Sequence, residues 1–294
     1  MTFLRGDEPT LLCFGYGFSA RCLAERVRQQ GWRVMASARS EEQRSALNAE
    51  GIEGYLFDDP NLIAEIPENA HILISAPPTP EGDPVLGLHR EALITAKSQI
   101  AWIGYLSTTA VYGDHAGGAV DEDTPVNAGS ERGKRRVEAE RAWLALAAEH
   151  GLPVHIFRLA GIYGPGRGPF EKVRKGTARR LIKDGQVFGR IHVEDIASTL
   201  IASIAKPAAG RVYNVTDDLT CPPQDVIAHA AELLGLPVPP EAPFEEADLS
   251  PMARSFYAEN KRVSNNRLHA ELGVALAYPT YREGLSAILA AEDV

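Results

Sequence analysis

The sequence predicts an α/β fold with a doubly wound parallel sheet and a small C-terminal cap domain. Short apolar runs alternate with helical patterns through the first half of the chain, as expected of βαβ units. A glycine turn joins the first apolar run to the first helical pattern, and the alternation breaks up beyond Gly164. We therefore expect a main domain at residues 1–163. A smaller substrate or cap region at residues 164–294 would return one strand and helices to the main core.

The composition indicates an ordinary globular protein that acts on small molecules, with 45% hydrophobic and 23% charged residues. A net charge of -9 disfavours nucleic acid and anionic membranes as partners. The three cysteines have no metal-ligand spacing, which favours reduced thiols, no metal and a cytoplasmic location. The first ten residues lack the apolar core of a signal peptide, and the apolar runs are too short to cross a bilayer.

Strands of the main domain are expected wherever a short apolar run is bounded by turn residues. Helices are expected between them, because capping residues precede the helical patterns and glycines follow them. The expected strands are Leu11–Phe14, Trp32–Ala38, Gly54–Phe57, His71–Ser75, Ile100–Ser107 and Val154–Leu159. The expected helices run from Ala20 to about Gly31, from Ser40 to about Gly51, from about Leu86 to Lys97, and from about Glu131 to His150.

The second half of the chain is less regular. We expect a helix from about Val193, a strand at Val212–Val215 and a final helix from about Tyr281. The acidic stretch Asp114–Asn127 and the proline-rich stretch Leu236–Pro251 are expected to be loops.

The strongest local signal is the pattern Gly15-x-Gly17-x-x-Ala20, placed directly between a strand and a helix. Gly15 permits a tight turn, Gly17 lets the backbone approach a diphosphate, and Ala20 lets the helix pack closely on the sheet. The amide groups and positive dipole end at the helix N-terminus would then face the phosphates, and Phe18 and Ser19 belong to the predicted cofactor site. This arrangement predicts a Rossmann-type dinucleotide site.

The end of the second strand favours NADP over NAD. NAD-specific Rossmann proteins usually carry an acidic residue there, about 20 residues after the glycines, but this chain has Arg39. Arg39, with the hydroxyls of Ser37 or Ser40, could neutralise a 2′-phosphate; alternatively Ser40 only caps a helix and Arg39 is a solvated charge. Asp58 could accept a hydrogen bond from the adenine or simply end the third strand. Ala76 and Pro77, after the fourth strand, complete the predicted cofactor site.

Several landmarks resemble the extended short-chain dehydrogenase/reductases, in their NAD-dependent epimerase/dehydratase branch. They occur in the family's order across nearly the whole chain, and the run Gly185–Phe188 resembles the atypical YeeZ-like group. The landmarks are Thr108–Gly113, Arg158 with Ile162–Arg167, Arg190–Ala197 and Val212–Val215.

The resemblance implies that Thr108 hydrogen-bonds a substrate oxygen and that Lys134 holds the nicotinamide ribose. The family's Tyr-x-x-x-Lys is here Ser130-x-x-x-Lys134, so the tyrosine is missing. A serine hydroxyl is far less acidic than a phenol and replaces it poorly as a proton donor. A helix N-cap is the simpler interpretation of Ser130. Lys134 opposes the helix dipole in a first turn, which favours a ligand for it.

Three explanations of the missing tyrosine stay open. Tyr112, Tyr163 or His192 could supply the proton, although core packing explains both tyrosines equally well. The reaction could instead need only Thr108 and water, or the protein could bind its cofactor without turnover. The resemblance also suggests Thr109, Arg167 and Arg190 as substrate contacts, beside His192.

Two further features have both a functional and a structural interpretation. Phe170–Arg190 carries seven basic and two acidic residues, which could clamp an anionic substrate group or form a solvated face. The apolar face of the helix Glu131–His150 could form a homodimer, as in the family, or pack on its own sheet.

We expect an NADP-dependent oxidoreductase or epimerase/dehydratase acting on a small polar substrate. The alternative is a non-catalytic NADP(H)-binding redox sensor.

Overall fold

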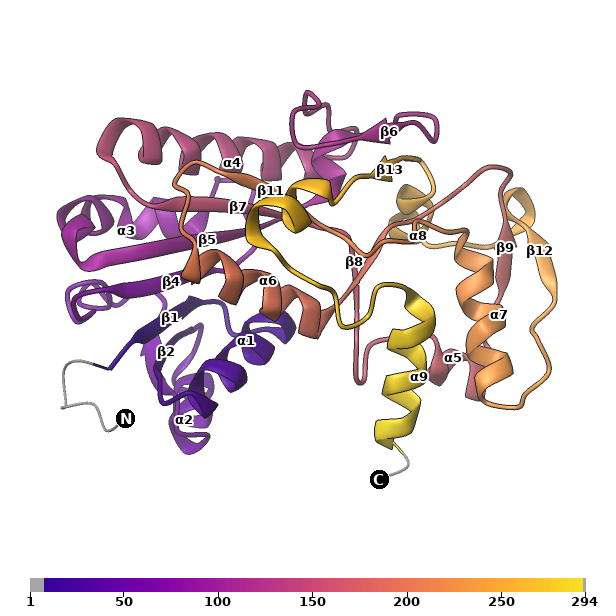
Figure 1. The fold of residues 1–294 in the computed structure, drawn as a ribbon, viewed down its shortest axis with the longest axis horizontal. Coiled ribbons are helices and arrows are strands. Elements are labelled where there is room, and N and C mark those ends of the chain that lie inside the picture. Colours follow the sequence, from indigo (N-terminus) through magenta and orange to yellow (C-terminus); the bar gives the residue numbers. More distant parts are fainter. Residues whose placement is uncertain (1–7, 293–294) are drawn as a thin grey trace. The chain divides into compact units, whose positions relative to one another are not determined.

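A computed structural model describes residues 8–292 of the chain (Figure 1). Its centre is a seven-stranded parallel sheet with the strand order β11-β7-β5-β4-β1-β2-β3. This order is that of a doubly wound sheet, so the predicted fold class is confirmed. The sheet strands are β1 (Thr10–Phe14), β2 (Arg33–Ala38), β3 (Glu53–Leu56), β4 (Ala70–Ile74), β5 (Ile100–Thr108), β7 (Val154–Leu159) and β11 (Val212–Val215).

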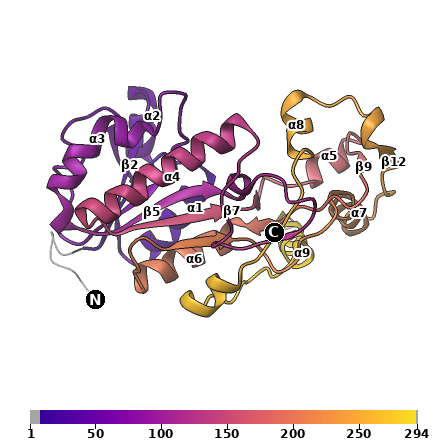
Figure 2. The ribbon, with the colours of Figure 1, turned by 90° about the horizontal axis from the view of Figure 1, so that it is seen from above.

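Helices cover both faces of this sheet. Helices α3 and α4 lie over one face, whereas α1 and α6 lie over the other (Figure 1), and α4 runs along β5 and β7 (Figure 2). Ser40 accepts a hydrogen bond from the Gln43 amide and caps α2, as the capping pattern predicted. The helices are α1 (Phe18–Gln29), α2 (Glu41–Ala49), α3 (Pro84–Thr95), α4 (Glu131–His150) and α6 (Val193–Ala205).

The apolar face of α4 packs on its own sheet. Trp143 is fully buried and Leu146 nearly so, in the same cluster as Ile103, Tyr105 and Ile156. The rings of Tyr105 and Trp143 lie 6.2 Å apart. The intramolecular interpretation therefore accounts for this face, and the homodimer stays a prediction.

The chain divides into two compact units. The first unit comprises the chain up to Ser107, Arg135–Arg158 and Ile196–Tyr213. The second comprises Thr108–Lys134, Leu159–Asp195 and the chain from Asn214 onward. The sequence suggested one boundary after residue 163, whereas the chain passes between the units several times.

The second unit contains three two-stranded parallel sheets, β10-β8, β12-β9 and β13-β6, that the sequence analysis did not predict. Its own apolar cluster joins Tyr163, Phe170, Ala230, Tyr281 and Leu285. The remaining elements are β6 (Ala119–Val120), β8 (Gly161–Tyr163), β9 (Arg180–Ile182), β10 (Arg190–His192), β12 (Glu241–Pro243), β13 (Arg262–Val263), α5 (Phe170–Arg174), α7 (Pro223–Leu233), α8 (Pro251–Phe256) and α9 (Tyr281–Glu292), with short helical turns η1 (Lys97–Gln99), η2 (Thr109–Tyr112), η3 (Phe244–Glu246) and η4 (Leu268–Leu272).

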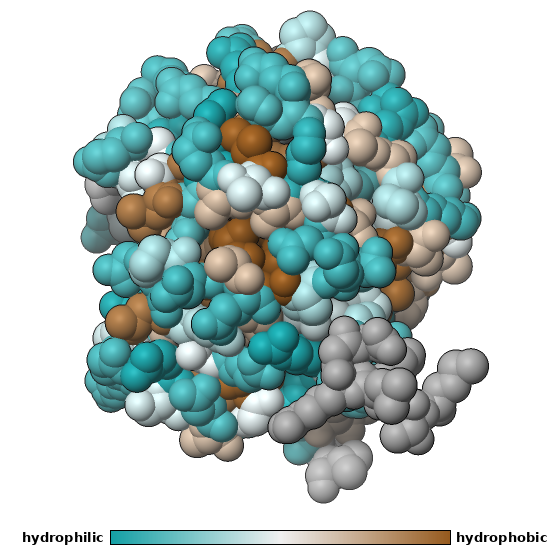
Figure 3. Space-filling view, turned by 90° about the vertical axis from the view of Figure 1, so that its left-hand side faces the viewer, coloured by the Kyte–Doolittle hydropathy of each residue, from teal (hydrophilic) through white to brown (hydrophobic). Residues whose placement is uncertain are grey.

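Among residues 8–292, no helix combines the length and apolar character that crossing a bilayer requires. Hydrophobic residues on the face shown in Figure 3 form small separate patches among hydrophilic ones.

A buried ion pair joins α4 to two strands of the sheet. Arg158, at 6% exposure, donates to both carboxylate oxygens of Glu140, with an Nη2–Oε2 distance of 2.8 Å. Ser107 at the end of β5 donates to the same carboxylate at 2.5 Å. Because Glu140 is only 3% exposed, losing one partner would leave a buried charge without compensation.

We predict that Arg158→Met lowers the free energy of unfolding by about 3–5 kcal/mol, the cost of breaking a buried pair. The control is Arg90→Met, because Arg90 pairs with Glu91 on the surface, where a pair contributes at most about 1 kcal/mol. Urea denaturation of both variants measures the difference. Equal, small losses would show that the buried pair does not hold α4 on the sheet.

Candidate functional site

The glycine turn in the first unit is held by two neighbouring strands. Gly15 adopts a left-handed conformation, φ +87°, and a Cβ there would lie 2.9 Å from the Ala76 amide nitrogen. The Gly15 amide donates to the Ser37 hydroxyl oxygen at 3.1 Å. Only glycine fits this close approach of two backbones, so the structure supports the role that the motif predicted for Gly15.

Gly17 is exposed at the start of α1. Gly17 is the N-cap of α1 and contributes no side-chain cap, and the first helical turn has no acidic residue. A Cβ placed on Gly17 would meet none of the described residues within 4 Å. The exposed Gly17 and the following Phe18, Ser19 and Ala20 therefore give a positive helix end that can receive a diphosphate.

The predicted specificity residues lie at the ends of β2, β3 and β4. Ser37 is buried and holds the Gly15 turn, and Ser40 caps α2. Arg39 is exposed, and its guanidinium forms no ion pair within residues 8–292. Its amide donates to the Gln43 side chain at 3.0 Å. Arg39 is therefore a basic group that is available to a ligand. Asp58 and Pro77 are also exposed.

Thr108, Thr109 and Tyr112 lie in the second unit, where β5 ends in the turn η2. The Thr108 hydroxyl accepts a hydrogen bond from the Ala110 amide at 3.2 Å and is partly exposed. Tyr112 is fully buried, and its hydroxyl donates to the Asn214 side chain at 2.7 Å. Thr108 can therefore still reach a ligand, whereas the surroundings of Tyr112 favour the packing interpretation.

Ser130 and Lys134 begin α4. The Ser130 hydroxyl accepts from the Gly133 amide at 3.1 Å, which is the N-cap contact that the sequence suggested as an alternative. The exposed Lys134 pairs with Glu131 one turn earlier at 2.8 Å. This hydrogen bond raises the pKa of Lys134, and the ligand expected for Lys134 stays a prediction.

His192 and Tyr163 are packed together in the second unit. His192 is 2% exposed, and its ring centroid lies 5.1 Å from that of Tyr163 and 4.0 Å from that of Tyr278. The Tyr163 hydroxyl donates to the Thr280 carbonyl at 3.3 Å. Burial raises the pKa of Tyr163 well above its usual value. These contacts also favour packing over proton transfer.

Most of the basic side chains that were predicted to bind an anion already contact other groups of the protein. Arg190 donates to the Phe188 carbonyl and to the Cys221 sulfur, both at 3.1 Å, and Arg167 is exposed in the turn after β8. Within the basic stretch, acidic partners neutralise three residues. These ion pairs are Arg174 with Glu292, Lys175 with Glu171, and Arg180 with Glu241.

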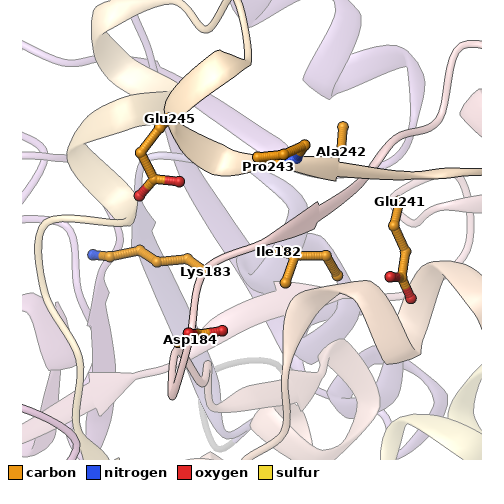
Figure 4. A pocket seen from close by; sticks show the side chains of 7 residues that line it. All are labelled: Ile182, Lys183, Asp184, Glu241, Ala242, Pro243 and Glu245. Carbon is orange, nitrogen blue, oxygen red and sulfur yellow. The ribbon is translucent and has the colours of Figure 1, made fainter.

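A pocket of about 550 Å³ lies in the second unit, where β9 and β12 pair (Figure 4). Lys183 and Asp184 follow β9, and Glu245 faces them from the turn after β12 (Figure 4). Lys183, from the basic stretch predicted to clamp an anion, lines it, whereas Thr109, Arg167, Arg190 and His192 do not. Its lining residues are Ile182, Lys183, Asp184, Glu241, Ala242, Pro243 and Glu245.

Sequence reasoning missed two ionisable features of the second unit. Asp217, 3% exposed, has no hydrogen-bond partner for either carboxylate oxygen among the described residues. Burial raises its pKa to about 7, although Arg190 opposes the shift. Lys261 and Glu259 form an ion pair at 2.6 Å whose side chains are 10% and 15% exposed. No sequence motif marked these residues, since single charges in irregular segments usually indicate solvated positions.

Comparison with known proteins places the chain in a family. A sequence model of the NAD dependent epimerase/dehydratase family matches residues 91–216. Protein YeeZ of Escherichia coli K12 is 30% identical over 280 residues, which cover 90% of this chain and 94% of YeeZ. The chain therefore belongs to the NAD-dependent epimerase/dehydratase family, and within it resembles YeeZ over nearly its whole length.

Solved structures support this assignment. A functionally unknown conserved protein from Silicibacter pomeroyi is 54% identical, with a TM-score of 0.90 over 96% of this chain and 99% of that one. A putative NAD-dependent epimerase/dehydratase from Methylobacillus flagellatus is 28% identical, with a TM-score of 0.70 over 98% and 99%. The dTDP-glucose 4,6-dehydratase of Bacillus anthracis in complex with NAD, 18% identical with a TM-score of 0.77 over 97% and 96%, shares the fold.

We predict that Asp217→Asn raises the free energy of unfolding relative to the wild type, and that this gain is larger at higher pH. The raised pKa means that the folded state keeps a proton which the unfolded chain loses near pH 4. Wild-type stability therefore falls between about pH 4 and pH 7, by up to about 4 kcal/mol for a shift of roughly three pH units. The variant lacks this loss. Urea denaturation at pH 4.5 and pH 8 measures it, and an equal effect at both values would contradict the raised pKa.

Proposed function

We propose that this chain binds a nicotinamide dinucleotide at the turn from Gly15 to Ala20. The observation that carries the proposal is the start of α1 at the exposed Gly17, where no side chain caps the helix by a hydrogen bond and a Cβ would meet no described atom within 4 Å. The family supports the same ligand, and the related dehydratase from Bacillus anthracis is in complex with NAD. Both faces of the turn are fixed by Ser37 and Ala76, so the amides are arranged before the ligand arrives.

The preferred nucleotide in this proposal is NADP(H). Arg39 follows β2 at the position from which Rossmann proteins contact the adenosine ribose. Its guanidinium is exposed and has no acidic partner within the described part of the chain, so it can bind a 2′-phosphate. An acidic residue that would favour the free ribose hydroxyls of NAD is missing from Ser37–Ser40.

The proposed reaction is an NADP-dependent oxidation, reduction or epimerisation of a small polar substrate. The bound nicotinamide would supply hydride exchange at a substrate carbon. Thr108 would donate a hydrogen bond to the substrate oxygen, because its partly exposed hydroxyl uses only its acceptor side for the Ala110 amide. Lys134, at 55% side-chain exposure, would hold the nicotinamide ribose as in the family. A cytoplasmic location and a homodimer also belong to this proposal.

One observation favours a second candidate, a non-catalytic NADP(H) sensor. The family's tyrosine is replaced by Ser130, whose hydroxyl caps α4, and the hydroxyls of Tyr112 and Tyr163 are both committed to internal hydrogen bonds. A sensor would bind the nucleotide tightly, turn over no carbonyl compound, and bind a protein partner in only one redox state.

We predict that Gly17→Ala weakens the binding of both NADPH and NADH at least tenfold, because a methyl group would occupy the approach to the diphosphate. Its thermal stability without ligand should not fall, since the added Cβ meets no described atom. The control is Gly87→Ala in α3, whose Cβ is also unobstructed. Calorimetric titration measures the affinities. Unchanged affinity in Gly17→Ala would overturn the proposed site.

Arg39→Asp tests the choice of nucleotide. Loss of a charged hydrogen bond worth roughly 1.5–3 kcal/mol should weaken NADPH binding about 10- to 100-fold and leave NADH binding nearly unchanged. Arg90→Asp is the control, because Arg90 is an exposed arginine outside the predicted site. Thermal unfolding with each nucleotide provides the readout, since a ligand at 100 times its Kd adds about 2.7 kcal/mol of stability. Equal losses for both nucleotides would contradict the NADP preference.

A further inference from the structure

Phe57, the residue that follows β3 in the first unit, is held at both of its backbone groups. Its amide donates to the Ala38 carbonyl at 2.8 Å. Its carbonyl oxygen lies 2.7 Å from Nε2 of His89 in α3, and His89 is the donor because a carbonyl oxygen only accepts. The turn after β3 is therefore tied both to the end of β2 and to α3.

The imidazole of His89 is buried in an aromatic cluster. His89 is 2% exposed, and its ring centroid lies 5.2 Å from that of Phe14 and 6.1 Å from that of Phe57. The rings of Phe14 and Phe57 meet edge to face at 5.7 Å. Phe14 directly precedes Gly15, and its carbonyl accepts from the Ala76 amide at 2.9 Å. His89 thus packs against both the strand that leads into the glycine turn and the turn after β3.

Two exposed side chains follow directly on the tied positions. Arg39 comes after Ala38, and Asp58 comes after Phe57. The hydrogen bond between Phe57 and Ala38 therefore holds close together the two residues that were predicted to contact the adenosine half of the nucleotide. The Asp58 carboxylate forms no hydrogen bond or ion pair with another residue of the described range 8–292, so it is available to accept from a ligand.

We propose that His89 is a positioning residue for the adenine of the bound nucleotide and acts through Asp58. By holding the Phe57 carbonyl, His89 fixes the turn that directs the Asp58 carboxylate to the 6-amino group of the base. This inference rests on the proposed nucleotide binding and deepens it, because it names the residues that recognise the base. His89 itself touches no ligand atom.

The chemistry of the two groups favours this pairing. The adenine 6-amino group donates hydrogen bonds, whereas an ionised carboxylate only accepts them. Hypoxanthine carries an oxygen acceptor at the same position, so it would meet the Asp58 carboxylate oxygen to oxygen. A fixed turn makes this discrimination strong, because a carboxylate on a loose turn would rotate away from the base and into water.

The test measures the ratio of two Kd values, that of the hypoxanthine analogue of NADPH and that of NADPH itself, by calorimetric titration. The wild type should prefer NADPH by about 10- to 100-fold, the usual contribution of a hydrogen bond to a charged group. His89→Phe keeps an aromatic ring and removes the donor, so the ratio should fall below about threefold. His89→Gln keeps an N–H donor and removes the ring, so its ratio should stay within about threefold of the wild type.

His155→Phe is the matched control. His155 is fully buried in the first unit, and its Nδ1 also bonds to a backbone carbonyl, that of Ile103, at 3.2 Å. It is not among the residues predicted to contact the nucleotide. His155→Phe should therefore lower the thermal stability and leave the ratio of the two Kd values unchanged.

A double variant separates positioning from general stability. Asp58→Ala alone should abolish the preference for NADPH. His89→Phe should weaken NADPH binding about tenfold in the wild type, but by less than about threefold when it is added to Asp58→Ala, because residues that act through one another are not additive. Equal losses in the two backgrounds would show that His89 has only a structural role and would overturn the inference.

A spectroscopic measurement on the wild type keeps the inference testable if His89→Phe does not fold. The NMR signal of the His89 Nε2–H group should shift when NADPH is added, and shift less when the hypoxanthine analogue is added. A signal that NADPH leaves in place would contradict the positioning role.

The failure of the inference and the failure of the proposed nucleotide site give different results. If the wild type binds both probes equally well, Asp58 does not recognise the amino group, and the inference fails while the nucleotide site stands. If neither probe binds, the proposed site itself is wrong.

Discussion

The close approach of Gly15 to the backbone of Ala76 is the constraint on which the nucleotide site depends. A side chain at Gly15 would collide with the chain leaving β4, and the left-handed φ of Gly15 excludes most other residues. Ser37 at the end of β2 holds the same turn from the other neighbouring strand. The turn is fixed by both neighbours of β1, and the chain enters α1 with Gly17 exposed and without a side-chain cap on the helix.

Polar side chains in the second unit serve mainly to hold backbone in place. The hydroxyls of Thr108 and Ser130 each accept from an amide two or three residues later, and Tyr163 donates to a distant carbonyl. Such bonds satisfy groups that would otherwise be buried without partners. The Thr108 hydroxyl uses only its acceptor side in this way, so its donor stays available to a ligand.

The sequence predicted those parts of the molecule that local signals determine. The glycine turn, the Ser40 cap, α4 and β7 follow from patterns within a few residues, and the structure confirms them. The short strands β8, β9, β10, β12 and β13 were missed because two or three residues carry no periodicity and each pairs with a distant segment. Glu259 and Lys261 were missed for the same reason: their partners Gly113 and Gly129 lie more than 100 residues away in the chain.

A crystal structure of the protein grown with millimolar NADP⁺ tests the central claim most directly. The account predicts density for the diphosphate within hydrogen-bond distance of the amides at the start of α1, with the 2′-phosphate against the Arg39 guanidinium. Crystals with no nucleotide at the Gly15–Ala20 turn, or with the nucleotide bound elsewhere, would contradict it.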